Sequence, residues 1–146
     1  MYKDLSQIEN LQKLELLSIG SGAGVTSILP ISKLTSLIGL SVENFQKISD
    51  YSVLSRLKNL EILSILGDGM APKYIKIDSL GFLEEMGQLR LFRLLTARLQ
   101  SKDYKPLLKL EKIEHLSIGK SKEITALLYE QFLELPELKW GLNSQG

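Results

Sequence analysis

Leucine and other apolar residues recur along the chain in one pattern, whose spacing changes from three residues to two within each copy. The clearest copy spans residues 48–65 and has apolar residues at Leu54, Leu57, Leu60, Leu63 and Ile65. A spacing of three indicates a bend or short helix, and a spacing of two indicates a short strand with one buried face. The pattern therefore predicts a turn that leads directly into a strand.

The pattern repeats through most of the chain. The apolar residue just before each strand serves as an anchor, and the anchors are Leu14, Leu37, Leu60, Leu89, Ile113 and Leu138. Successive anchors lie 23, 23, 29, 24 and 25 residues apart. Periods of about 20–29 residues with Leu-x-x-Leu-x-Leu are typical of leucine-rich repeats. We therefore predict one domain over 1–146 with about six repeats, at 2–24, 25–47, 48–76, 77–100, 101–123 and a closing element at 124–142 that is helical across 124–133.

The upstream half of each repeat carries its own signal. A short polar residue stands four positions before an apolar one, at Asp4, Ser27, Asp50, Ser79 and Asp103. Such side chains accept hydrogen bonds from the free N–H groups that begin a helical turn. Pro30 and Pro106 follow three residues later, where a missing N–H costs little. The predicted fold class is α/β: a solenoid with a parallel concave sheet and short helices or 3₁₀ turns on the convex side.

The chain resembles internalin-type bacterial leucine-rich repeats. The resemblance is carried by residues 25–37 (VTSILPISKLTSL) and 48–54 (ISDYSVL) and extends over almost the whole chain. It implies a repeat solenoid of bacterial type. The asparagine that is usual three residues after the last strand leucine is replaced here, at Gly22, Phe45, Asp68, Ala97 and Ser121. The secretion signal and helical N-terminal cap of invasion internalins are not recognisable.

The residues between the buried ones are predicted to face outward on the concave side. They form three rows across the strands, beginning at Leu16, Ser18 and Gly20. Large apolar patches on proteins usually mark contact sites. We predict a protein-binding face with an apolar centre and a serine stripe, formed by Leu16, Ser41, Glu43, Ile62, Ser64, Leu66, Leu91, Arg93, Leu95, His115, Ser117 and Trp140. The alternative is that the chain's own loops cover part of this face.

Two further features are candidate contact sites. Arg93 interrupts the serine row, and with Arg90 and Arg98 nearby it is a candidate for binding a carboxylate or phosphate. The insertion at 68–76 makes one repeat interval longer and offers Met70, Tyr74 and Ile75 for apolar contact. Drift is the competing explanation for the insertion, because extra loop residues cost little entropy.

Composition and motifs argue against several other functions. The 18 lysines and arginines nearly balance 17 acidic residues, so a net charge of +1 favours neither nucleic acid nor a membrane surface. The absence of cysteine removes disulfides and thiolate chemistry. His115 is the only histidine and has no carboxylate in its row, and the glycine-rich segment 20–24 lacks the spacing of a nucleotide-binding loop. We therefore expect no enzyme activity, no cofactor and no metal.

The sequence leaves the partner open. The favoured hypothesis is a module that binds another protein. The alternatives are a scaffold segment that forms a homo-oligomer through an uncapped N-terminal edge, and a cytosolic immunity-type protein that binds a cognate toxin. No signal peptide and no run of about 18 apolar residues is visible, so we expect a cytoplasmic location, or secretion if the chain is a fragment.

Overall fold

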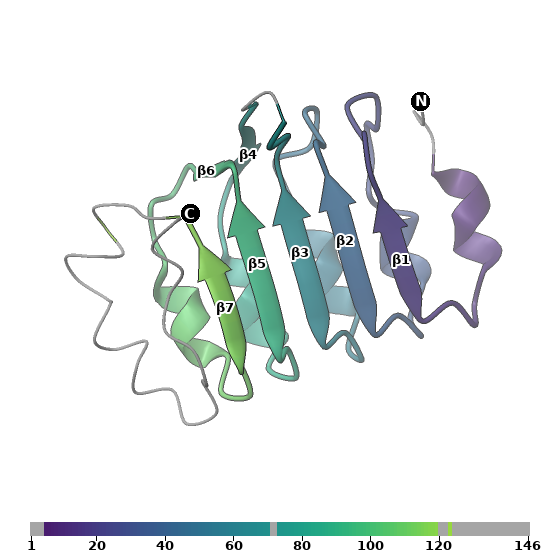
Figure 1. The fold of residues 1–146 in the computed structure, drawn as a ribbon. Helices are drawn as coiled ribbons and strands as arrows, with labels where there is room; N and C mark the ends of the chain where they lie inside the picture. The colour runs from purple at the N-terminus through teal and green to yellow at the C-terminus, as the bar shows by residue number, and fades with distance from the viewer. Residues whose placement is uncertain (1–4, 71–72, 120–122, 124–146) are drawn as a thin grey trace.

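The computed structural model describes residues 5–70, 73–119 and 123. Its main sheet contains β1 (Leu16–Ile19), β2 (Gly39–Glu43), β3 (Ile62–Leu66), β5 (Leu91–Leu95) and β7 (His115–Ile118), all parallel and in that order (Figure 1). Each of these strands follows a short 3₁₀ helix: η1 (Ser6–Asn10), η2 (Ile31–Lys33), η3 (Ser52–Arg56), η4 (Gly81–Glu85) and η5 (Lys105–Lys109). The predicted solenoid of strands and 3₁₀ turns is confirmed.

The register of the sheet is the one that the leucine pattern predicts. Leu17, Leu40, Leu63, Phe92 and Leu116 lie directly opposite one another on successive strands. Because side chains alternate between the two faces of a strand, a slip of one residue would move every one of them out of the core. The buried row therefore fixes which residues face outward.

A continuous apolar core lies between the sheet and the 3₁₀ helices. Leu40, Leu63 and Phe92 are at most 2% exposed. The 3₁₀ helices contribute Ile31, Leu54, Leu83 and Leu107, each at most 1% exposed. One repeat cannot bury its leucines alone, so stacking of neighbouring units supplies the burial.

The polar residues predicted as helix caps form side-chain turns instead, because the N-cap positions belong to Pro30, Tyr51, Leu80 and Tyr104, none of which makes a side-chain cap hydrogen bond. The side-chain oxygen of Ser27, Asp50, Ser79 and Asp103 in each case accepts a hydrogen bond from the backbone N–H two residues later, at 2.9–3.2 Å. Each residue stands before its 3₁₀ helix and closes a side-chain turn, a geometry that Asp and Ser favour. The backbone N–H and the hydroxyl of Ser52 hold the pKa of Asp50 below its ordinary value. Pro106 lies in the first turn of η5.

Polar side chains just before the strands form hydrogen bonds between neighbouring repeats, here called the polar ladder. The leucine spacing did not predict them. Ser36 Oγ donates to the Leu14 carbonyl at 3.2 Å. At the equivalent position, Asn59 Nδ2 donates to the Thr35 carbonyl at 3.3 Å, and Gln88 Nε2 donates to the Leu57 carbonyl at 3.2 Å. These side chains join the turn of one repeat to that of the next, and the Leu57 carbonyl also accepts a hydrogen bond from the Leu60 N–H at 3.2 Å within its own turn. A polar residue directly before each anchor leucine is the signal that identifies this ladder.

The insertion builds a second sheet. β4 (Ile75–Ile77) pairs in parallel with β6 (Ala97–Leu99), so the predicted repeat boundary at 76/77 falls inside a strand. Ahead of β4, Asp68 and Lys73 exchange two backbone hydrogen bonds of 3.0 and 2.9 Å. The branch starts at Gly67, where an added Cβ would lie only 2.1 Å from the Thr96 carbonyl oxygen. Within the described residues, the insertion therefore adds a paired strand, in which Ile75 is only 1% exposed and belongs to the core instead of offering a contact.

The predicted closing element at 124–142, including its helix at 124–133, lies outside the described residues. Among the residues that are described, none belongs to a helix long and apolar enough to cross a membrane.

Candidate functional site

The concave face carries the three outward rows in register. Leu16, Gly39, Ile62, Leu91 and His115 form the first row, and Ser18, Ser41, Ser64, Arg93 and Ser117 form the second. Glu43, Leu66 and Leu95 continue the third row. Parallel strands lie about 4.8 Å apart, so residues of one row are close neighbours. The predicted contact residues within the described chain therefore share one face of the sheet.

A notch lies in the first row, at the position without a side chain. Gly39 is flanked on the neighbouring strands by Leu16, 68% exposed, and Ile62, 42% exposed. The resulting depression has a volume of about 320 Å³, and Ser41 and Ser64 line it beside these residues. An added Cβ at Gly39 would lie 2.8 Å from Leu16 Cδ2 and 3.8 Å from Ile62 Cβ, so the Leu16 side chain leans over the buried Gly39 and forms one wall of the depression.

The predicted contact residues differ in exposure. Leu16, Ile62, Glu43 and Arg93 are exposed, and Leu66, Leu91, Leu95, Ser41, His115 and Ser117 are half-buried. The apolar surface is therefore concentrated near the notch rather than spread along the sheet. Ser64 is only 6% exposed because it lies in the middle of the central strand, between Ile62 and Leu66 on the same face. Trp140 lies outside the described residues.

The three arginines do not form the single group that their proximity in sequence suggests. Arg90 forms an ion pair with Glu61 at 3.6 Å and a shorter one with Glu114, the residues that directly precede the neighbouring strands β3 and β7. Glu114, and to a smaller extent Glu61, raises the pKa of the Arg90 guanidinium. Arg98 lies on β6 in the second sheet. Arg93 is thus the exposed arginine in the serine row of the concave face.

The other chemical motifs have structural explanations. His115 is half-buried at the start of β7 and lies opposite Leu91. An added Cβ at Gly22 would lie 2.1 Å from two ring carbons of Phe45, so this glycine of the segment 20–24 is needed for packing between repeats. Within the described residues, no three His, Cys, Asp or Glu side chains are grouped as metal ligands.

Comparison with known proteins supports the fold. No model of a protein family and no curated protein matches the chain. Among solved structures, internalin C2 from Listeria monocytogenes matches with a TM-score of 0.69 at 20% sequence identity. The match covers 97% of this chain and 57% of the internalin chain. This chain therefore spans little more than half the length of its neighbour, and at this identity the likeness concerns the fold.

The parallel sheet, the 3₁₀ helices before its strands and this match agree with one another. The chain folds as a leucine-rich repeat solenoid like that of internalin C2.

Proposed function

We propose that the chain is a protein-binding module that anchors its partner at the notch over Gly39. The observation that carries this proposal is the pairing of an absent side chain with two exposed apolar walls, Leu16 and Ile62. An apolar side chain of a partner inserted there buries both walls and itself. Burial of apolar area contributes about 25 cal/mol per Å², and a few such anchors dominate the energy of most interfaces.

The surroundings of the notch suit a protein partner. Ser18 and Ser41 supply hydroxyl donors and acceptors beside the apolar walls. Arg93, farther along the same row, offers a planar guanidinium that forms paired hydrogen bonds with a carboxylate. An apolar centre with a polar surround is the usual anatomy of an interface. We propose binding rather than catalysis because the face presents surface and hydrogen-bonding groups instead of a nucleophile held beside a base.

Filling the notch tests this proposal directly. Gly39→Val places a side chain in the opening, and the cost in stability is small because the exposed Leu16 side chain moves aside and valine suits a strand. Gly87→Val is the matched control, since an added Cβ at Gly87 meets no atom within 4 Å. Peptides are selected from a randomised library on the immobilised wild-type chain, and their Kd values are then measured by isothermal titration calorimetry.

We expect selected peptides with an apolar anchor to lose affinity at least about tenfold on Gly39→Val, a change of about 1.4 kcal/mol. The same peptides are expected to bind Gly87→Val as tightly as the wild type. Unchanged affinity for a folded Gly39→Val chain would place the binding surface elsewhere and refute the notch.

Self-association through the edge strand β1 is a second candidate, favoured by a separate observation. Leu11 is 50% exposed, and Leu14 and Leu17 are only half-buried, whereas their counterparts in later repeats are fully buried. An exposed strand edge beside exposed apolar residues favours pairing with another strand. Sedimentation equilibrium over a wide concentration range separates the candidates, because a monomer at every concentration excludes this one.

A further inference from the structure

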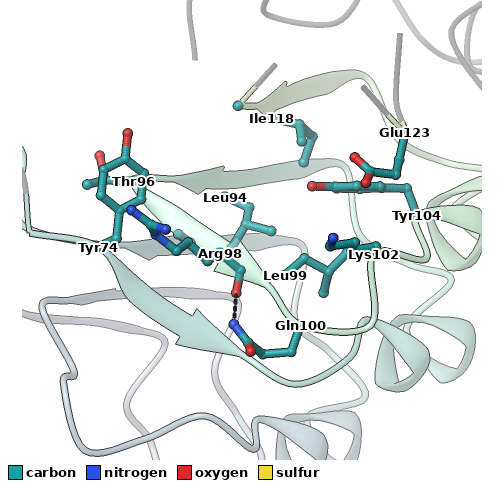
Figure 2. A pocket seen from close by; sticks show the side chains of 12 residues that line it. Tyr74, Leu94, Thr96, Arg98, Leu99, Gln100, Lys102, Tyr104, Ile118 and Glu123 are labelled. Carbon is teal, nitrogen blue, oxygen red and sulfur yellow. Dashed lines mark hydrogen bonds between the residues drawn. The ribbon is translucent and has the colours of Figure 1, made fainter. Parts of the chain in front are cut away.

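A cavity that is separate from the concave notch lies along β6 of the second sheet. The cavity has a volume of about 470 Å³ and lies beside β6, where β5 and β7 end (Figure 2). Leu94, Leu99 and Ile118 give it an apolar floor, and Tyr74 and Tyr104 stand at its two ends. Its size is within the range of about 300–1,000 Å³ that is typical of ligand pockets. Local spacing does not predict this cavity, because its lining comes from segments as far apart in sequence as Tyr74 and Ile118.

Among the described residues, two cations and one carboxylate line this cavity. Arg98 lies over the ring of Tyr74, with its guanidinium carbon 4.9 Å from the ring centroid, and Lys102 also lines the cavity. Neither cation forms an ion pair with a residue of the described chain. Lys76 is exposed and lies opposite Arg98 in the β4–β6 pair. The carboxylate that lines the cavity, Glu123, stands at the Tyr104 end, away from Tyr74 and Arg98 (Figure 2).

The backbone at Lys102 is an independent sign of a specialised site. Its φ of 56° lies in the left-handed region, which is unfavourable for a lysine. Ser21, Asn44 and Thr96 also have positive φ, but they occupy one equivalent position after the main strands and so belong to the repeat. Lys102 has no such counterpart among the described residues. Backbone strain of this kind concentrates at binding and catalytic sites, and here it holds a cation beside the cavity.

We propose that this cavity binds a carboxylate-bearing segment of a protein partner, an acidic peptide whose apolar part contacts Leu94, Leu99 and the tyrosine rings. Arg98 is held by Tyr74 with its hydrogen-bonding fork available for a carboxylate, and Lys102 adds a second charge. The proposal rests on the proposed function in taking a protein as the partner, and it adds a second contact point outside the concave face. A nucleic acid fits less well, because the basic groups surround one cavity that also contains a carboxylate instead of following an extended row of phosphates.

The test uses the full chain and a fluorescent peptide of alternating glutamate and leucine, with the glutamine version of the same peptide as a control. Fluorescence anisotropy measures affinity for the wild type and for the Arg98→Glu, Lys102→Gly and Lys58→Glu variants. Lys58 is an exposed lysine on the turn that follows η3 and is the matched control for charge. Lys102→Gly is not expected to strain the backbone, since glycine accepts the left-handed conformation that Lys102 adopts.

We expect the glutamate peptide to bind more tightly than the glutamine peptide, by an amount that falls as salt is added. Arg98→Glu is expected to weaken binding about tenfold and Lys102→Gly about threefold, while Lys58→Glu changes it by less than about twofold. The melting temperature of Lys102→Gly is expected to be no lower than that of the wild type. Gly39→Val is expected to leave this affinity unchanged, so the notch and the cavity succeed or fail separately.

Three results would overturn the proposal. The first is equal binding of the glutamine peptide, and the second is wild-type affinity in folded Arg98→Glu and Lys102→Gly chains. The third is displacement of the peptide by inorganic phosphate or short single-stranded DNA at concentrations where free glutamate has no effect, which would identify a phosphate site instead.

Discussion

The first and third repeats share one apolar pattern but differ in burial. In the third repeat, Leu54, Leu60 and Leu63 are at most 1% exposed. At the same positions in the first repeat, Ile8, Leu14 and Leu17 are only partly buried. Repeats pack against the third one on both sides, whereas within the described chain the first repeat has a neighbour on one side. The pattern of leucines thus sets the direction in which a side chain points, and the neighbouring repeats determine how far it is buried.

The sharpest test of this difference is one substitution made at both positions. Leu63→Asp is expected to lower the free energy of unfolding by more than about 4 kcal/mol, because an unpaired carboxylate would be buried on the central strand. Leu17→Asp is expected to cost only about 1–2 kcal/mol, since water reaches the half-buried edge strand. Urea denaturation followed by circular dichroism measures both. Equal costs would show that the two repeats are equally buried in solution.

A second test concerns the branch that distinguishes the third repeat. Gly67→Ala is expected to cost about 3 kcal/mol, because the new methyl group would meet the backbone carbonyls of Thr96 and Lys73. The Ile75 N–H, which donates to the Thr96 carbonyl at 3.1 Å, is expected to exchange with solvent faster. Gly87→Ala is the control, because its added methyl group meets no atom within 4 Å. A Gly67→Ala chain as stable as Gly87→Ala would contradict the close approach of these backbone segments.

Periodicity predicted the main sheet because both signals it uses are local. The order Leu63-Ser64-Ile65 gives the inward and outward directions on β3, and Asp50 at its fixed offset gives the side-chain turn that precedes η3. The second sheet was not predictable in this way, because β4 and β6 are short and their pairing joins two repeats.

The site followed the same division. The rows of the concave face were predicted, but the notch depends on Leu16 and Ile62 standing on either side of Gly39. The ion pairs of Arg90 with Glu61 and Glu114 were likewise not predictable from sequence, because they depend on the register between strands. Sequence spacing identified the face, and the packing of neighbours selected the part of it that is open.

A third test removes the buried hydroxyl of Tyr51 in the third repeat. The positions equivalent to Tyr51 are Leu5, Ile28, Leu80 and Tyr104. The Tyr51 hydroxyl is buried and has no hydrogen-bond partner among the described residues, and burial raises its pKa. Tyr51→Phe removes the desolvated hydroxyl and keeps the ring, so we expect a gain of about 1 kcal/mol in the free energy of unfolding. A loss of stability in thermal or urea unfolding would mean that the hydroxyl has a partner in solution.

The smallest expected change in stability concerns the side-chain turns before the 3₁₀ helices, one closed by the charged Asp50 and one by the neutral Ser79. Asp50→Ala removes the hydrogen bonds from the N–H and hydroxyl of Ser52, and Ser79→Ala removes the one from the Gly81 N–H. Each substitution is expected to cost about 0.5–1 kcal/mol at neutral pH. The Asp50 pKa is lower in the folded state, because the N–H and hydroxyl of Ser52 stabilise the carboxylate. Its stabilisation is therefore present above the ordinary value of 3.8 and is lost as the pH falls through the folded-state pKa.

Urea unfolding of both variants and the wild type between pH 7 and about pH 3 measures this difference. The cost of Asp50→Ala is expected to shrink at the acidic end, and that of Ser79→Ala is expected to stay constant, because a hydroxyl has no charge to lose. If the stability costs of both substitutions stayed constant with pH, Asp50 would act through hydrogen-bond geometry alone, and its charge would contribute nothing to the stability of the third repeat.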